Sequence, residues 1–419
     1  MSDALAAIVG AEGLLTGAET ASFAVNGAVP PVVVLPRDRD QVAAVVSHAR
    51  ESGQSIVPFG GGTRIEQGRA PSRLDLVLCT RKLHRVVDYQ PDDMTVAVEA
   101  GVTLKDLQEV LAERSQFLPL NPALPGEATV GGIVASAASG PWRAGYGTPR
   151  DWVIGCRVVD SEGRLVRGGG QVVKNVAGYD LPKLYTGSFG TLGVLVEVTF
   201  KVLPRPPATG FARVVGLTAA GAETVAAAVM DSDLQPSAME LYQPEGSRDG
   251  KEWALLLQFM SSPEAVEWQL GHLERLAQAG EVERLEESAG EAVLAHLRDL
   301  PSRGWLRARI STLSSRVASL AAAAVSLSRE QGWTAEVGGH AATGQVLVVS
   351  GDATSEAAVA LRELAQRAEA RCLFERLPAD AREIDPWGEP GPDAAIMRGV
   401  KAALDPTNTF SPGRFYGGI

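Results

Sequence analysis

Three consecutive glycines follow an apolar segment in the stretch VPFGGGTR, Val57 to Arg64. Glycine loses more backbone freedom on folding than any other residue, so a run of three is costly to order. The backbone N–H groups of such a run can, however, converge on an anion with no side chain in the way. The run therefore favours either a tight structural turn or an anion-binding loop, and by itself it leaves the two open.

Two further glycine clusters lie at the edges of expected helices and strands. The stretch PGEATVGGIVASAASG, Pro125 to Gly140, opens a helix of small residues, and GSFGTLGVL, Gly187 to Leu195, precedes an alternating strand. Three such loops favour several contacts around one elongated ligand, such as a dinucleotide. The Rossmann and P-loop fingerprints are absent, because no GxGxxG opens a helix after a first strand and no GxxxxGKS/T occurs.

The chain is expected to form two main parts joined by the stretch PRPPATG, residues 204–210. Residues 30–206 alternate short apolar strands with amphipathic helices, such as the helix predicted over residues 37–53 with its glycine stop. Residues 207–385 combine alanine-rich helices with strands such as WALLLQF and GQVLVVSG, which predicts an α+β fold with an antiparallel sheet. A small helical segment is expected over residues 1–29.

Local patterns add three expectations. Alternation within TLGVLVEVTFKVLP predicts a half-buried strand with one polar face. Residues 386–419 are predicted to form a helix with Ile396, Val400 and Leu404 on one face, followed by a Pro/Gly tail that returns to the first part. The sequence shows no internal repeat of fixed period.

Composition and charge narrow the function classes. The 419 residues are 45% hydrophobic with a net charge of -11, which argues against nucleic acid or an anionic membrane surface as the main partner. Cys79, Cys156 and Cys372 are widely spaced, so neither a disulfide framework nor a thiolate metal site is predicted. No apolar run approaches the ~18 residues of a membrane span, and the N-terminal stretch has no basic segment. We therefore expect a cytoplasmic protein without a signal peptide or a transmembrane segment.

Longer stretches resemble a known family of flavoproteins. IVPFGGGTR, KNVAGYDLPKLYTGSFGTLG and ALDPTNTFSPGR are similar to FAD-linked oxidases of the vanillyl-alcohol-oxidase superfamily, and within it to the FAD-binding subunit of glycolate oxidase, the GlcE type. The similarity is strong over residues 30–207. It implies a PCMH-type FAD-binding domain of two α/β subdomains, followed by an α+β cap with an antiparallel, ferredoxin-like sheet.

The resemblance also implies where FAD binds. The first glycine loop would hold the pyrophosphate, the second would continue the phosphate and ribityl contacts, and the other residues would lie along the adenine, ribityl or flavin ring. No histidine stands in the first loop, where some relatives attach the flavin covalently, so noncovalent FAD is expected. The residues implied in cofactor binding are Pro58, Gly60, Gly61, Gly62, Thr63, Gly126, Thr129, Gly131, Gly132, Ser136, Gly145, Tyr146, Gly190, Leu192, Gly193 and Val194.

Three side chains are candidates for the chemistry. Arg309, with Arg307 on the same expected strand of the cap, is either a ligand for a substrate carboxylate, because its fork matches two oxygens, or a solvated surface charge. His340 is either a proton acceptor near the flavin or a hydrogen-bonded histidine in a sheet. Lys174 stands in the flavin-fold motif and, like Tyr179, is a candidate to face the ring.

The cap departs from the histidine motifs of relatives that oxidise 2-hydroxy acids. Those relatives carry HAGDGNxH-like and EHG-like motifs. Here His340 keeps the first position, but Leu347 stands at the second histidine, Thr343 replaces the acidic residue, and no EHG occurs. A single imidazole is a poor metal site, so no bound metal is predicted.

Two functions remain open at this point. As an enzyme, the chain would take a hydride from glycolate, D-lactate or another 2-hydroxy acid onto FAD and pass the electrons to an iron–sulfur partner. As a partner, it would carry the flavin without catalysing and support a catalytic sister subunit. The resemblance implies both companions, a sister FAD-binding subunit and an iron–sulfur subunit, and it leaves open a peripheral position at the inner membrane through them. Three scattered cysteines cannot ligate a cluster unaided.

Overall fold

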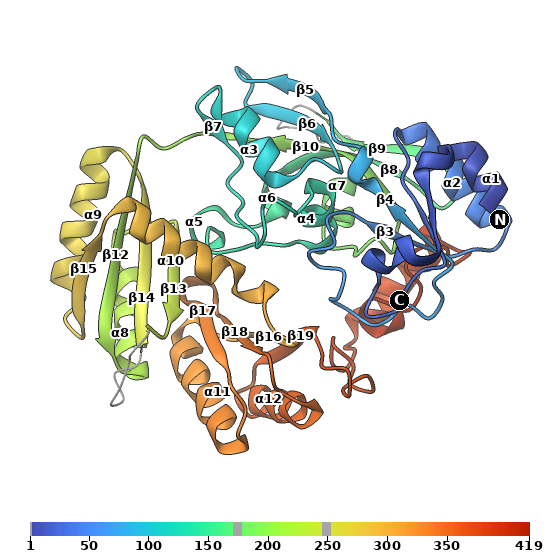
Figure 1. The fold of residues 1–419 in the computed structure, drawn as a ribbon. Coiled ribbons are helices and arrows are strands. Elements are labelled where there is room, and N and C mark those ends of the chain that lie inside the picture. Colours follow the sequence, from blue (N-terminus) through green and yellow to red (C-terminus); the bar gives the residue numbers. More distant parts are fainter. Residues whose placement is uncertain (1, 171–177, 245–252) are drawn as a thin grey trace.

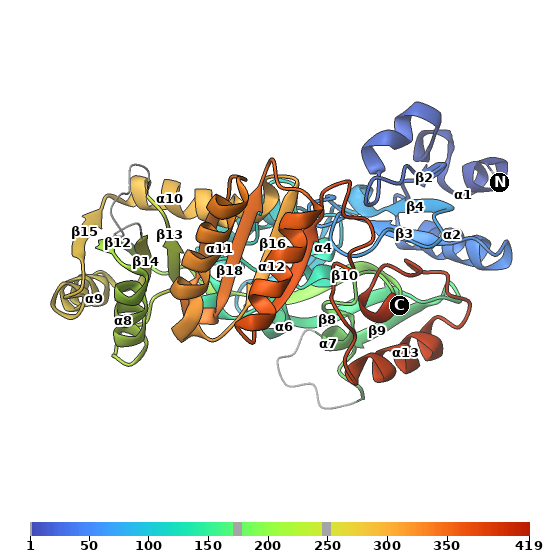
Figure 2. The same ribbon diagram turned by 90° about the horizontal axis from the view of Figure 1, so that it is seen from below.

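The computed structural model describes residues 2–170, 178–244 and 253–419. An N-terminal body holds two sheets and a cap holds a third large sheet, and both termini lie on the N-terminal body (Figure 1). The last helix and the tail return from the cap to that body, so segments far apart in the sequence lie side by side there (Figure 2).

A four-stranded sheet opens the N-terminal body. Its strands are β1 (Leu14–Thr16), β2 (Val32–Val34), β3 (Ile56–Phe59) and β4 (Leu76–Cys79). Its helices are α1 (Ser2–Val9) and α2 (Arg39–Glu51). The order is β1-β2-β4-β3, with β2 and β3 parallel to β4 and β1 antiparallel to β2. The first 29 residues are thus not only helical, because β1 adds an edge strand to this sheet.

A five-stranded antiparallel sheet forms the second subdomain. Its strands are β5 (Val86–Gln90), β6 (Thr95–Glu99), β8 (Val153–Val159), β9 (Leu165–Gly169) and β10 (Val194–Lys201). Its helices are α3 (Leu104–Ala112), α4 (Val130–Ser136), α5 (Arg143–Tyr146), α6 (Pro149–Trp152) and α7 (Leu181–Tyr185). A two-stranded ladder joins β7 (Gln116–Phe117) to β11 (Leu203–Pro204). The order of the large sheet is β5-β6-β10-β8-β9.

The central strand β10 differs from its prediction. The alternating pattern predicts one polar face, but Leu195 and Thr199 are buried and Glu197 is paired with Arg157. Val196 packs with α2 and the first sheet, whereas Leu195 packs with α3 and α4. The strand is covered on both faces because it lies between the two subdomains, and the pattern of a single strand does not reveal that second cover.

The cap is one eight-stranded antiparallel sheet built from two similar halves. Its strands are β12 (Ala208–Leu217), β13 (Ala238–Tyr242), β14 (Trp253–Ser261), β15 (Glu281–Leu285), β16 (Leu306–Ser311), β17 (Glu336–His340), β18 (Gln345–Ser350) and β19 (Arg371–Arg376). Its helices are α8 (Ala219–Met230), α9 (Pro263–Leu276), α10 (Glu287–Asp299), α11 (Val317–Gln331) and α12 (Ser355–Arg367). The first strand, β12, begins within the stretch expected as a linker.

The predicted ferredoxin-like arrangement occurs twice in this sheet. Each half runs strand, helix, strand, strand, helix, strand, and the sheet order β15-β12-β14-β13-β17-β18-β16-β19 is the same in both halves when it is read from the two edges. β13 pairs with β17 to join the halves. The cap is therefore a structural duplication, although the sequence shows no repeat of fixed period.

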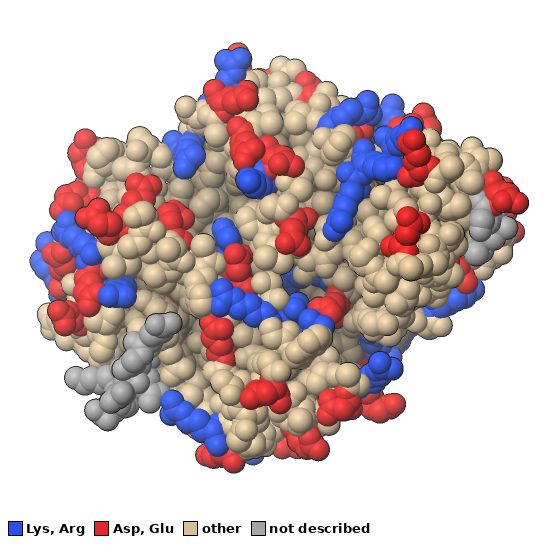
Figure 3. All heavy atoms as spheres, viewed as in Figure 1, with Lys and Arg blue, Asp and Glu red and all other residues tan. Residues whose placement is uncertain are grey.

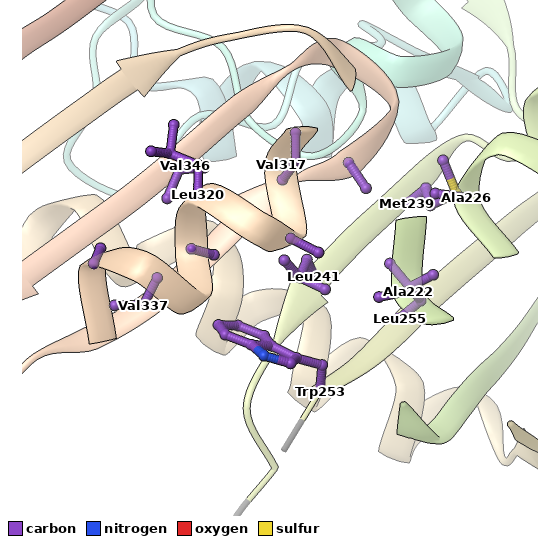
Figure 4. Packing of buried hydrophobic residues seen from close by; sticks show 14 of the residues in the cluster. Ala222, Ala226, Met239, Leu241, Trp253, Leu255, Val317, Leu320, Val337 and Val346 are labelled. Carbon is purple, nitrogen blue, oxygen red and sulfur yellow. The ribbon is translucent and has the colours of Figure 1, made fainter. Parts of the chain in front are cut away.

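The main core of the cap lies on one face of its sheet. The helices α8, α9, α11 and α12 cover that face, and side chains such as Met239, Trp253 and Leu320 pack between helices and strands (Figure 4). The helix α10 lies on the opposite face, where Leu294 packs with Phe211 and with Trp142 of the N-terminal body. The inner face of the sheet thus points toward the N-terminal body.

The chain ends with α13 (Asp393–Leu404), which is fixed to the N-terminal body by a buried lysine. Lys401 Nζ donates to the carbonyl oxygens of Thr191 (2.8 Å) and Phe410 (2.8 Å) and to Asp405 Oδ2 (2.6 Å). This lysine connects α13 and the tail to the loop before β10.

The apolar face predicted for α13 is buried only toward its C-terminal end. Val400 and Leu404 are partly buried against the core of the second subdomain, but Ile396 is 74% exposed. Ala394 and Lys401 supply the buried positions of the helix instead. The buried side is therefore centred on a lysine, which an apolar pattern does not indicate.

Candidate cofactor site

The three glycine clusters meet at one cavity in the N-terminal body. Its empty volume, which includes space open to solvent, is about 750 Å³. The loop after β3, the start of α4 and the loop before β10 form its walls. The lining residues are Pro58, Phe59, Gly60, Gly61, Gly62, Thr63, Arg64, Ile65, Thr80, Gly131, Gly132, Ala135, Ser136, Ser188, Phe189, Gly190, Gly193, Val194, Leu195 and Arg414.

Close packing against α4 requires glycine in the first loop. A Cβ at Gly61 would overlap the carbonyl oxygen of Glu127, and a Cβ at Gly60 would overlap the hydroxyl of Thr129. The loop backbone therefore lies directly against the segment that begins α4. The loop brings bare backbone, rather than side chains, to the cavity.

The first loop presents unused hydrogen-bond donors. Among the described residues, the N–H groups of residues 60–64 find no acceptor. The carbonyl oxygens of Gly60 and Gly61 accept hydrogen bonds from Arg81 Nε (3.1 Å) and Nη2 (2.8 Å). Because the C=O and N–H of a trans peptide point in opposite directions, this fork turns the N–H groups of Gly61 and Gly62 away from Arg81. A run of such donors suits an anion.

The loop before β10 is fixed to α4 and to the first loop. The N–H of Phe189 donates to the carbonyl oxygen of Ala135 (2.8 Å). Gly190 has a φ of +64°, and a Cβ there would lie 3.1 Å from Cγ of Pro58. Gly193 has a φ of +157°, which side chains rarely adopt. Glycine at position 190 allows the loop to approach the first one closely, and glycine at position 193 allows it to pack against Val158 of β8.

Most of the residues predicted to bind the cofactor line this cavity. They are Pro58, Gly60, Gly61, Gly62, Thr63, Gly131, Gly132, Ser136, Gly190, Gly193 and Val194. Thr129 lies behind them as the N-cap of α4, where its hydroxyl accepts a hydrogen bond from the N–H of Gly132 (3.3 Å).

Four other described residues predicted for the cofactor lie outside this lining. Leu192 is buried in the core of the second subdomain. The N–H of Gly145 donates to the carbonyl oxygen of Ser237 (3.2 Å), so Gly145 and Tyr146 lie where α5 meets the cap. Gly126 stands in the turn before α4 with open space around it.

Sequence reasoning missed several lining residues, and Arg414 above all. Arg414 is 4% exposed and stands in the tail stretch FSPGR, more than three hundred residues from the glycine loop that it contacts. The resemblance of ALDPTNTFSPGR to the family was the available signal. Sequence reasoning also missed Phe59, Arg64, Ile65, Thr80, Ala135, Ser188, Phe189 and Leu195.

Of the two candidates from the flavin-fold motif, the structure describes one. Lys174 lies outside the described residues. Tyr179 is described and is 93% exposed. The side chain of Tyr179 therefore points to solvent.

His340 is buried on the inner face of the cap sheet. Its Nδ1 lies 2.7 Å from Oε2 and 2.9 Å from Oε1 of Glu240, which stands directly opposite on β13. Nε2 of His340 finds no partner among the described residues. The carboxylate thus occupies one ring nitrogen and leaves the other available.

Arg309 belongs to a cluster of ion pairs that joins the cofactor loop to the cap. Arg309 Nε lies 3.2 Å from Oε1 of Glu375, and Arg64 Nη1 lies 2.5 Å from the same oxygen. Burial opposes ionisation of Glu375, but the two guanidinium groups lower its pKa below the ordinary value. Burial, in turn, lowers the pKa of Arg309. Since Arg64 lines the cavity, the cluster links the first loop to β16 and β19.

A second set of ion pairs lies beside the first. Glu66 pairs with Arg307 (3.4 Å) and Arg376 (3.0 Å), and the Arg376 guanidinium lies over the ring of Trp305 at 4.2 Å. Basic and acidic side chains are interspersed over this face of the molecule (Figure 3). The contact between the N-terminal body and the cap is thus strongly ionic.

Neither a metal centre nor a membrane-spanning helix occurs among the described residues. No group of three or more His, Cys, Asp or Glu side chains there is arranged to hold a metal ion. The strand register places Leu347 between Arg309 and Gly338. None of the described helices has the length and hydrophobicity to cross a lipid bilayer.

Comparison with known proteins defines the class. Residues 30–169 match the family described as FAD binding domain. The solved structure of p-cresol methylhydroxylase with substrate bound superposes with a TM-score of 0.77, covering 99% of this chain and 95% of that chain at 17% identity. The chain therefore carries an FAD-binding domain, with FAD as its cofactor, in a PCMH-type α+β fold, and these predictions are confirmed.

Curated relatives indicate a more specific similarity, to subunits of glycolate oxidase. Glycolate oxidase subunit GlcE of Escherichia coli (strain K12) is 45% identical over 130 residues, which cover 30% of this chain and 37% of the relative. Glycolate oxidase subunit GlcD of Bacillus subtilis (strain 168) is 34% identical over 178 residues, which cover 42% of this chain and 38% of the relative. The predicted similarity to glycolate oxidase subunits is thus confirmed, and the match spans less than half the length of each relative.

Proposed function

We propose that this chain is the FAD-binding subunit of an oxidoreductase that acts on 2-hydroxy acids such as glycolate or D-lactate. The observation that carries the proposal is the cavity where the free N–H groups of residues 60–64 meet α4 and the loop before β10. Such donors suit a pyrophosphate. The names of the glycolate oxidase relatives support the substrate class. The loop holds no histidine, so we propose noncovalent FAD.

The residues proposed for the chemistry lie on the inner face of the cap sheet. Arg309 would bind the substrate carboxylate with its fork. His340 would accept the hydroxyl proton at Nε2, because Glu240 holds Nδ1. FAD, when bound, supplies the acceptor for the hydride on carbon 2. Lys174 remains a candidate from the sequence.

A flavin-carrying, noncatalytic subunit is the second candidate, and one observation favours it. Arg309 is paired with Glu375, so its guanidinium already has an anionic partner. A substrate carboxylate would have to compete with Glu375 for Arg309. In this alternative, a sister FAD-binding subunit oxidises the substrate and this chain supports it.

Partners follow from the same reasoning. We propose a sister FAD-binding subunit and an iron–sulfur subunit. The described cysteines are buried free thiols, and burial raises the pKa of Cys156 and of Cys372 to about 12, which disfavours their use as thiolate ligands. Electrons would therefore leave through a partner. Reduced thiols support a cytoplasmic location, with any membrane contact made by the partners.

Anaerobic reduction of the flavin tests the two candidates. The chain is produced alone and with its proposed partners, loaded with FAD, and mixed without oxygen with glycolate, D-lactate or 2-hydroxyglutarate. Bleaching of the flavin in the lone chain, lost in Arg309→Met while FAD stays bound, supports catalysis. Bound flavin that stays oxidised in the lone chain and bleaches in the complex supports the carrier. A chain that takes up no FAD, alone or in the complex, contradicts both.

A further inference from the structure

Arg414 is a buried cation in the cavity wall with no anion beside it. The residue is 4% exposed and lines the cavity together with the first glycine loop. No carboxylate of the described residues forms an ion pair with it, and burial lowers its pKa to about 10. An uncompensated buried charge is strongly unfavourable. A bound anion would therefore stabilise the charge of Arg414, and the described residues supply none.

Hydrogen bonds hold one end of the Arg414 guanidinium. Nη2 donates to the carbonyl oxygens of Ile65 (2.6 Å) and Gln67 (3.1 Å) and to Oδ1 of Asn26 (3.1 Å), and Nε donates to the carbonyl oxygen of Arg69 at 3.4 Å. Nη1 donates to no atom of the described residues. One end of the planar group is thus fixed to the segment after the glycine loop, and the other end keeps its two N–H donors free.

The backbone of Arg414 is fixed as well. Its carbonyl oxygen accepts hydrogen bonds from Nε1 of the buried Trp387 (3.0 Å) and from the N–H of Arg69 (3.0 Å). The guanidinium is therefore held in place by its surroundings before any ligand arrives. Such preorganisation lowers the entropy lost on binding.

We propose that the free Nη1 end of Arg414 is the counter-ion of the cofactor's pyrophosphate. This inference rests on the proposed cofactor site. The N–H groups of residues 60–64 supply dipoles on one wall of the cavity, and Arg414 supplies a full charge on another. Arg64 also lines the cavity, but Glu375 lies 2.5 Å from its Nη1. Among the described lining residues, Arg414 is the cation that keeps its charge available.

The test is a titration of the FAD-free chain with FAD and with ADP, which carries the diphosphate without the flavin. In Arg414→Gln the amide still reaches toward the carbonyl oxygens, but the charge is gone. We expect both ligands to bind at least tenfold more weakly, while adenosine is unaffected. Arg414→Lys keeps a positive charge but lacks the guanidinium fork, so its affinity for FAD and ADP should lie between those of the wild type and of Arg414→Gln. Arg398→Gln, an exposed arginine of α13, is the matched control and should stay within twofold of the wild type.

The outcomes separate this inference from the proposed function. If the wild-type chain binds neither FAD nor ADP, the cofactor site itself is wrong. If it binds both and Arg414→Gln binds ADP within twofold of the wild type, the role of Arg414 is wrong. A loss for FAD with unchanged ADP affinity also overturns it, because the arginine would then serve the flavin ring. Should Arg414→Gln fail to fold, the same ADP comparison with Arg414→Lys decides.

Discussion

Nδ1 of His340 lies 2.7 Å from Oε2 of Glu240, and the two residues stand directly opposite each other where the two halves of the cap sheet meet. Their side chains are 8% and 2% exposed. The pair belongs to the junction between β13 and β17, so it joins the two ferredoxin-like units. The same bond fixes the tautomer of His340, because Nδ1 donates to a carboxylate. A structural and a catalytic role are therefore compatible at this histidine.

Removing the Glu240 carboxylate should weaken the cap without affecting FAD. Glu240→Ala leaves a buried imidazole without its partner, and we expect the free energy of unfolding to fall by about 2 kcal/mol. Glu283→Ala is the matched control on the edge strand, where the pair with Arg213 is partly exposed and should be worth under about 1 kcal/mol. Urea denaturation measures both. Equal losses in the two variants would contradict a special role for the junction.

Local sequence patterns indicated the three glycine loops, and the resemblance to the flavoprotein family assigned the cofactor to them. The runs around Gly61, Gly131 and Gly190 each follow or precede a regular element, so their backbone character can be predicted from neighbouring residues alone. The pairing of Arg64 with Glu375 could not be predicted in this way, because the partners come from the two ends of the chain. The burial of Arg414 could not be predicted from neighbouring residues either, because it depends on the return of the C-terminal tail to the N-terminal body.

The duplication of the cap could not be predicted from the sequence, for a related reason. The two halves share the order of strands and helices, but the sequence does not repeat at a fixed period. Hydrophobic alternation defines single strands, whereas the pairing of β13 with β17 is set by packing of whole units. Val196 illustrates the same limit at the level of one residue, because α2 and the first sheet, which cover it, are distant in the sequence.

Acid should loosen the contact between the first loop and the cap through Glu375. Arg64 and Arg309 lower the pKa of its carboxyl from the ordinary value of 4.5, against the effect of burial. The pKa of the Glu375 carboxyl is therefore lower in the folded chain than in the unfolded chain. The ionised carboxylate stabilises the fold at pH values above the unfolded pKa, and this stabilisation is lost as the pH falls through the folded pKa. In thermal denaturation from pH 7 to pH 3, the wild type should lose stability more steeply than Glu375→Gln. Parallel curves would contradict the assignment.

An added methyl group at Gly61 should disrupt the cofactor site. The Cβ of Gly61→Ala would overlap the carbonyl oxygen of Glu127, so the loop must move away from α4. We expect FAD to bind at least about tenfold more weakly, or about 1.4 kcal/mol. Gly126→Ala is the matched control, since its nearest neighbour would be Cδ of Lys105 at 3.9 Å. Fluorescence quenching of FAD measures the affinity of both variants. Weaker FAD binding by Gly126→Ala would indicate that Gly126 contacts the cofactor after all.

Arg81 should act on FAD affinity through the orientation of the loop. Its guanidinium holds the carbonyl oxygens of Gly60 and Gly61, and Arg81→Gln releases at least one of them. The loss of about 1 kcal/mol in a net hydrogen bond corresponds to roughly fivefold weaker FAD binding. Lys82→Gln removes the same charge from the neighbouring residue, whose Nζ donates to the carbonyl oxygen of Glu12 (3.0 Å). If the two variants weaken FAD equally, charge rather than orientation explains the effect.

The buried Lys401 should matter both for stability and for the third glycine loop. Its Nζ joins Asp405 to the carbonyl oxygen of Thr191, which lies between the lining residues Gly190 and Gly193. Lys401→Met leaves Asp405 buried without its cation, so we expect a loss of about 3 kcal/mol or more in the free energy of unfolding. Hydrogen exchange should rise at the backbone N–H of Thr191, which donates to the carbonyl oxygen of Ser188 (3.0 Å).

The matched control for this lysine is Lys183→Met. The pair of Lys183 with Asp180 lies at the surface, with both side chains about half exposed, and should contribute under about 1 kcal/mol. Lys401→Met combined with Asp405→Asn should recover part of the stability, because the uncompensated charge is removed. If Lys401→Met costs no more than Lys183→Met and leaves the exchange of Thr191 unchanged, the lysine does not hold the loop, and the geometry of the loop must come from its glycines and from α4 alone.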